Sequence, residues 1–221
     1  MVRLLFAALV LLPSSKALAG EWDEIRQVEI RPVEDTLFAT PVYDNECDGS
    51  QAKAWPSSEI GWDEIINIGK EFWQIIEANK PVVHVELPVA HAMPRGLNCW
   101  SELESWQIPR TQSYEVIYKN GFGIKVVTFR FRLQFTYGGS HAGRGRYLAN
   151  VSVLASQLDV VWGYTFNANV DVARAVNLGS SHDPLAGLEM NLHWNVKTVL
   201  KESENSVHFF VSGNGDVQFA Q

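Results

Sequence analysis

The stretch TFRFRLQFTYGGSHAGRGRYLANVSVL, which runs from Thr128 to Leu154, decides the fold class. Apolar residues occupy the odd positions from Val127 to Tyr137, and threonine, arginine or glutamine occupies most of the even positions between them. Because successive side chains of a β-strand point to opposite faces of a sheet, this alternation predicts a strand with one apolar and one polar face. A glycine-rich segment then interrupts the pattern, which resumes at Tyr147.

The same alternation returns along the rest of the chain. It runs through 158–172 and 188–196, and shorter versions follow at 206–212 and 217–219. Polar or glycine-rich turns separate these segments, as in a meander of antiparallel strands. Further strand candidates precede them at 28–33 and 37–43.

One segment, GWDEIINIGKEFWQIIEANKP at 61–81, has a different period. Its large apolar residues fall at helical spacing, so we expect an amphipathic helix that packs on the apolar face of the sheet. Gly69 is unfavourable inside a helix, which suggests a close contact with a neighbouring element at that point. The sequence therefore predicts an α+β fold that is mostly β, with one helix on a long antiparallel meander sheet. The predicted stripe consists of Trp62, Ile65, Ile66, Gly69, Phe72, Trp73 and Ile76.

An outer-membrane β-barrel is the alternative architecture, because its strands show the same alternation. The strands of such a barrel need only about 9–11 residues, and their aromatic residues gather in two girdles. Here the alternating segments are longer and carry aromatic residues throughout. The apolar stripe of the expected helix also requires an apolar surface to cover it. The sequence favours the sheet with a packed helix.

The N-terminus has the layout of a secretory signal peptide. Arg3 precedes an apolar segment, 4–12, and Ala17-Leu18-Ala19 provides small residues for cleavage. We expect a signal peptide at 1–19, a single domain at 20–221, and a protein that is periplasmic or extracellular. No later segment has the ~18 apolar residues that a transmembrane helix needs.

Composition narrows the function. The formal net charge of the 221-residue chain is −7. Nucleic-acid binding requires lysine and arginine to neutralise phosphates, so the sequence predicts no nucleic-acid partner. An exported protein with two cysteines, Cys47 and Cys99, is expected to join them in a disulfide. That bond would close a loop of about 50 residues, a restraint of roughly 4 kcal/mol in the chain-entropy model.

The glycine-rich segment at 138–146 is the first candidate site. His141, Arg144 and Arg146 lie among four glycines, whose backbone amides could turn towards an anion while the arginines bind carboxylate or phosphate. The segment matches neither the phosphate loop of nucleotide hydrolases nor the dinucleotide fingerprint. The alternative is a hairpin connection whose arginines are only solvated.

Other residues could bind a metal or a ligand. His84, Glu86 and His91 could hold zinc, although their spacing matches no familiar ligand motif and a structural role is the simpler interpretation. Among the eight tryptophans, those on apolar stripes are expected in the core: Trp62, Trp73, Trp162 and Trp194. Trp100 and Trp106 have no such stripe and are the better candidates to face a ligand.

These features predict an exported, non-enzymatic binding or envelope-interaction protein without a cofactor. Its partner would be an envelope polysaccharide, another anionic ligand or a protein. The alternatives are an extracytoplasmic hydrolase or metal enzyme that uses the two histidines and Glu86, and an outer-membrane barrel. Metal analysis of the purified protein would distinguish the binding protein from the metal enzyme.

The disulfide can be tested directly. If Cys47 and Cys99 are bonded, thiol titration of the denatured, unreduced protein finds no free thiol, and titration after reduction finds both. Two reactive thiols before reduction would remove this restraint from the fold.

Overall fold

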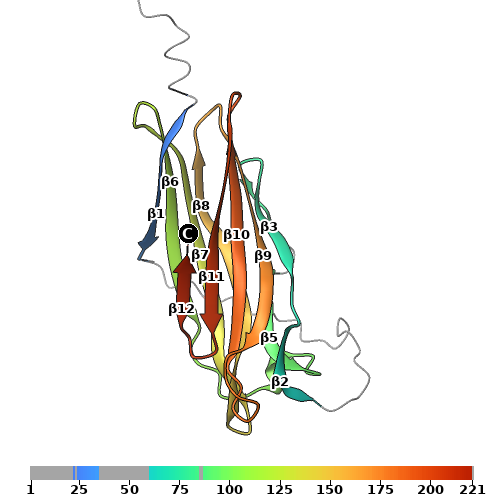
Figure 1. Ribbon diagram of the computed structural model, residues 1–221. Helices are drawn as coiled ribbons and strands as arrows, with labels where there is room; N and C mark the ends of the chain where they lie inside the picture. The colour runs from blue at the N-terminus through green and yellow to red at the C-terminus, as the bar shows by residue number, and fades with distance from the viewer. Residues whose placement is uncertain (1–21, 23, 35–59, 85–86, 221) are drawn as a thin grey trace, which may run out of the picture.

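The computed structural model describes residues 22, 24–34, 60–84 and 87–220, and these form two antiparallel six-stranded sheets (Figure 1). The first sheet has the order β1 (Ile25–Val33), β6 (Arg110–Asn120), β7 (Lys125–His141), β8 (Arg144–Val160), β5 (Ala90–Arg95) and β2 (Gly61–Asn67). The second has the order β12 (Val217–Ala220), β11 (Glu202–Ser212), β10 (Ala186–Lys197), β9 (Thr165–Asn177), β3 (Phe72–Glu77) and β4 (Lys80–Pro81). A 3-10 helix covers Trp100–Glu102.

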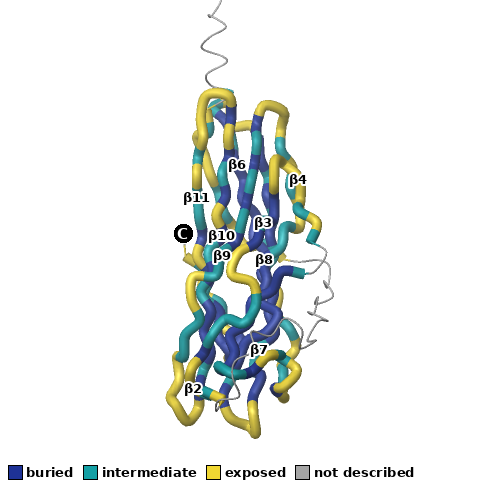
Figure 2. The backbone as a smooth tube through the Cα atoms, turned by 90° about the vertical axis from the view of Figure 1, so that its right-hand side faces the viewer, coloured by how far each residue is buried: buried dark blue, intermediate teal, exposed yellow. Residues whose placement is uncertain are grey.

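The apolar faces of the two sheets pack against each other and form one core. Phe209 of β11 packs against Tyr114 of β6 and Phe131 of β7, with ring centroids 5.8 and 5.7 Å away. Phe166 of β9 lies 4.8 Å from Phe129 of β7. The inward positions of the long strands are therefore buried, whereas exposed residues lie at both ends of the elongated molecule and in places along its sides (Figure 2).

The mainly antiparallel β fold is confirmed, but the strands divide into two sheets where the sequence suggested one. The alternating segment 158–172 is not one strand, because a turn at Val161–Tyr164 ends β8 and starts β9. This turn carries the chain from the first sheet to the second. The predicted signal peptide at 1–19 and the strand candidate at 37–43 lie outside the described residues.

The predicted amphipathic helix at 61–81 is wrong: this segment forms β2, β3 and β4. Trp73 and Ile76 are buried as expected, but Phe72 is 58% exposed because it points to the opposite face of β3 from Trp73. The side chain of Asn67 accepts a hydrogen bond from the Gly69 amide and so supports a bend between β2 and β3. Short apolar segments match both periods, and here pairing with strands distant in sequence decides between them.

The close approach predicted at Gly69 is confirmed, although in a different element. A Cβ atom at this position would lie 2.3 Å from the carbonyl oxygen of Val89 and 2.9 Å from Cα of Ala90. The Lys70 amide donates to the same carbonyl, at 2.8 Å. Glycine is therefore needed where the bend touches the segment that leads into β5.

Polar contacts help to hold neighbouring strands, and the two sheets, in their observed pairing. Glu115 of β6, whose side chain is 3% exposed, accepts hydrogen bonds from Arg31 of β1 and Arg130 of β7, each with a contact of 2.6 Å. Burial opposes the charged form of Glu115, but the two guanidinium groups outweigh it and lower the pKa of this carboxyl. Between the sheets, the Tyr118 hydroxyl accepts hydrogen bonds from Trp194 and Asn205, and burial raises the pKa of Tyr118 to about 12.

Two adjacent residues of β3 provide a test of this fold. Trp73 is 3% exposed and donates its indole N–H to the Val153 carbonyl of the other sheet, at 3.1 Å. We expect Trp73→Ala to lower the free energy of unfolding by about 3–5 kcal/mol. The matched variant Phe72→Ala should cost less than about 1 kcal/mol, because its ring is largely in solvent. Urea denaturation measures the free energy of unfolding of both variants. Equal losses would mean that Phe72 and Trp73 are both buried, as the predicted helix required.

Candidate functional site

The outer side of the second sheet is unusually rich in amide and imidazole side chains. Along β9, inward Phe166, Ala168 and Val170 are fully buried, so the residues between them point outwards. β10 and β11 alternate in the same way. We call the resulting surface the amide face. It consists of Gln74, Asn167, Asn169, Asp171, Asn191, His193, Asn195, Glu204, Ser206 and His208.

Strand register arranges the amide face in rows across the sheet. The middle row contains Gln74, Asn169, His193 and Ser206, from β3, β9, β10 and β11. On one side lies the row of Asn167, Asn195 and Glu204, and on the other that of Asp171, Asn191 and His208. Phe72 pairs with Asp171, so its exposed ring continues the last row at the β3 end.

Hydrogen bonds among these side chains hold the outer rows in place. Asn167 donates to the side-chain oxygen of Asn195 at 3.0 Å, and Asn195 donates to Glu202 at 3.0 Å. In the opposite row, the carboxylate of Asp171 accepts from Asn191 at 2.9 Å and lies 2.8 Å from Nε2 of His193. The amides are therefore preoriented by their neighbours.

A hollow of about 450 Å³ lies over the middle of the amide face. Asn169, one of the residues that line it, makes no side-chain hydrogen bond to the described residues, so both its amide donor and its acceptor are open to a ligand. His193, which contacts Asp171, is the register partner of Ser206, but no hydrogen bond joins the Ser206 hydroxyl to this imidazole in the described part of the chain. The hollow is lined by Asn167, Asn169, His193, Trp194, Asn195, Glu204, Asn205 and Ser206.

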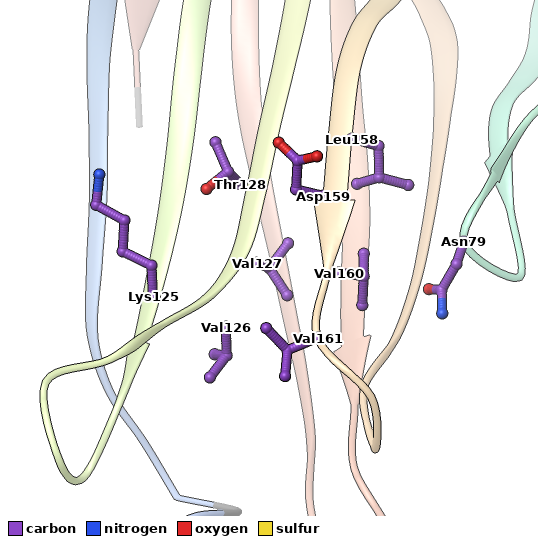
Figure 3. A pocket seen from close by; sticks show the side chains of 9 residues that line it. All are labelled: Asn79, Lys125, Val126, Val127, Thr128, Leu158, Asp159, Val160 and Val161. Atoms are coloured by element: carbon purple, nitrogen blue, oxygen red, sulfur yellow. The ribbon is translucent and has the colours of Figure 1, made fainter.

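A second hollow, of about 410 Å³, lies where β7 and β8 meet near their turns (Figure 3). Four of its nine lining residues are valines, and Lys125 and Asp159 are the charged ones. With few convergent polar groups, it offers less basis for specific recognition than the amide face.

The glycine-rich segment predicted as a site forms the ends of β7 and β8, joined by a turn at Ala142-Gly143. Arg146 is held by Asp183 at 2.9 Å and by Asn214 at 3.0 Å. The ring of His141 stacks on Trp62, with centroids 4.1 Å apart. Arg144 is exposed and has no ion pair with the described residues, so it remains the most accessible cation of the predicted set.

The two tryptophans predicted to face a ligand are half-buried and pack against the core. Trp100 and Trp106 meet edge to face, with ring centroids 6.2 Å apart. A Cβ atom on Gly139 would lie 2.4 Å from the Trp106 ring, so this glycine lets the indole cover β7. Their contact with a ligand stays a prediction.

Two of the three residues predicted to bind zinc, His84 and His91, are described and have different neighbours, and the zinc site stays a prediction. The Nε2 atom of His84 is 2.7 Å from the carbonyl oxygen of Gln74 in the second sheet, whereas His91 is buried in β5 of the first. Glu86 lies outside the described residues. Within the described part of the chain, no three histidine, cysteine or acidic side chains form a group suited to a metal ion.

Cys99 precedes the 3-10 helix, where its sulfur accepts a hydrogen bond from the Ser101 amide at 3.4 Å. Cys47 lies outside the described residues, so the disulfide stays a prediction.

The amide face was missed by sequence reasoning, although its signal is visible. The segments FNANVD at 166–171 and MNLHWN at 190–195 place asparagine, aspartate or histidine at every second position. We expected such positions simply to be solvated. What the sequence does not contain is the register that brings Asn169 beside His193.

Comparison with known proteins gives no relative from which to transfer a function. No protein-family model matches the chain, and neither the curated proteins nor the solved structures contain a significant match.

The two arginines of the β7–β8 hairpin should behave differently. Arg146→Ala removes the contacts to Asp183 and Asn214, and a half-exposed ion pair of this kind is worth up to about 1 kcal/mol. Amide hydrogen exchange in 178–185 should therefore quicken by up to about fivefold. Arg144→Ala, the matched control, should leave exchange in this segment unchanged. Equal effects of the two substitutions would mean that Arg146 does not hold this loop.

Proposed function

We propose that the protein is an exported, non-enzymatic binding protein that holds an uncharged, hydroxyl-rich carbohydrate chain, such as an envelope polysaccharide, on the amide face. The observation that carries this proposal is the set of asparagine and histidine rows beside the exposed ring of Phe72.

The chemistry of the amide face suits hydroxyl groups. Each asparagine offers both a donor and an acceptor, and a hydroxyl can likewise donate and accept. The amides of Asn167 and Asn191 are already oriented by their neighbours, so binding costs little side-chain entropy there. Side-chain amides are neither acids nor bases at neutral pH, which favours binding over catalysis.

Phe72 supplies the apolar part of the site. Its ring is 58% exposed beside Asp171, so one aromatic surface is open to a ligand next to the polar rows. The C–H side of a sugar ring is an apolar surface of matching size. A flat ring at one end of a row of amides therefore suits a sugar that stacks and hydrogen-bonds at once.

The carboxylates of the amide face favour neutral over acidic carbohydrates. Asp171 and Glu204 lie on the amide face, and Glu202 lies at its edge. These carboxylates disfavour acidic polysaccharides, since like charges across an interface weaken association. An anionic ligand fits better at the exposed Arg144, which is the second candidate site and makes a different prediction.

Binding to an array of neutral and acidic glycans tests the proposal, with the affinity of any positive measured by calorimetry. Asn169→Ala and Phe72→Ala should each weaken binding of a neutral glycan by about tenfold or more. Gln157→Ala is the matched control, because it removes an exposed amide from the first sheet.

Arg144→Ala separates the two candidate sites. It should leave neutral-glycan binding unchanged. If acidic glycans bind instead, and Arg144→Ala but not Asn169→Ala abolishes that binding, the ligand site is the β7–β8 hairpin and the proposal for the amide face is wrong.

A further inference from the structure

The two ends of the sandwich differ sharply in polarity. Because the strands are antiparallel, the β6–β7, β8–β9 and β10–β11 turns lie at one end, and the β7–β8, β9–β10 and β11–β12 turns at the other (Figure 1). The first set carries six of the twelve large apolar residues that are exposed in the described chain. We call them the apolar tips: Phe122, Ile124, Val161, Trp162, Val199 and Leu200.

These side chains project into solvent where the sequence predicted burial for one of them. Trp162 continues an apolar alternation and was expected in the core, but it is 92% exposed at the β8–β9 turn. The turn is closed by a hydrogen bond from the Tyr164 amide to the Val161 carbonyl, which takes Trp162 out of the strand pattern. On the β10–β11 turn, Val199 and Leu200 are 88% and 71% exposed.

The three turns are neighbours. The amide of Val161 donates to the carbonyl of Val126 at 2.9 Å, which joins the β8–β9 turn to the start of β7 (Figure 3). Thr165, just after the β8–β9 turn, pairs with Lys197 at the end of β10. The apolar tips therefore lie on three adjacent turns at one end of the molecule, and exposed apolar residues gathered in this way mark an interaction surface.

Two lysines lie directly beside the apolar tips, and Asp159 is the carboxylate that shares a hollow with one of them, Lys125. Lys125 directly follows Ile124, and Lys201 directly follows Leu200. Both lysines are exposed and neither has an ion pair with the described residues, whereas the chain as a whole has a net charge of −7. Glu202, next to Lys201, is matched by Lys197 at 3.7 Å.

We propose that the apolar tips insert into the surface of a lipid bilayer that contains anionic lipids, and so attach the protein by this end. Tryptophan is favoured at the boundary between headgroups and acyl chains, while lysines beside inserted side chains can reach back to the phosphates. Separate convex turns suit a deformable lipid surface better than a protein partner, which would need a matching pocket for each turn. This inference is independent of the proposed carbohydrate site.

Cosedimentation of the full protein with phosphatidylcholine vesicles, with and without phosphatidylglycerol, is the test. The wild type should bind, and more strongly when phosphatidylglycerol is present. Trp162→Ala/Leu200→Ala should weaken binding by more than about tenfold. Ile108→Ala is the matched control: Ile108 is 86% exposed but precedes β6 at the opposite end. Lys125→Gln/Lys201→Gln should remove the preference for phosphatidylglycerol.

A second measurement locates the contact. Vesicles with brominated acyl chains should quench part of the wild-type tryptophan emission, and Trp162→Phe should abolish that quenching while it still binds. Failure of the wild type to bind either vesicle, or equal binding by Trp162→Ala/Leu200→Ala, would overturn the proposal. So would a dimer in sedimentation that becomes a monomer in the double variant, because a second copy would then cover the tips.

Discussion

The contact of Phe209 with Tyr114 and Phe131 is the one on which the rest of the architecture depends. It joins β11 of one sheet to β6 and β7 of the other, and strands that alternate apolar and polar residues can bury their apolar side only if such a contact exists. Once the inner faces meet, every second residue of the long strands must point outwards. The packing of the two sheets therefore determines which residues are exposed and available to bind a ligand.

Part of this structure could be predicted from sequence because it depends on local periodicity. The strands around Phe129 and Met190 follow directly from their alternation, and they are confirmed. The helix at 61–81 fails because a seven-residue and a six-residue strand, joined by a bend at Gly69, imitate helical spacing. The information that distinguishes them is the pairing of β2 with β5 and of β3 with β9, which is distant in sequence. Trp162 was misplaced for a related reason: even-numbered positions face the core on both sides of the turn, so the alternation does not reveal that the turn places Trp162 in solvent.

The candidate site required still more non-local information. A residue such as Asn169 is ordinary on an outward position, and so is His193. They become a site only because register places them side by side, with Asp171 and Asn191 in the neighbouring row. By contrast, Arg146 stood out in the sequence as a basic residue in an acidic protein, yet it contacts Asp183 and Asn214. The sequence shows that basic residues gather locally in an acidic protein, but only the fold shows that residues of two other loops contact Arg146.

The two proposed surfaces have a geometric relation that follows from the sandwich. The apolar tips lie at the end of the strands, whereas the amide face runs along the side of β9, β10 and β11. A sandwich attached by its tips stands with its strands away from the lipid surface, so the hollow over Asn169 stays in the aqueous layer beside the membrane. A carbohydrate chain in that layer could then cross the strands without competing with lipid for the same side chains. The two proposals rest on opposite consequences of one alternating pattern: the turns expose apolar residues at the end of the sandwich, and strand register gathers polar residues on its side.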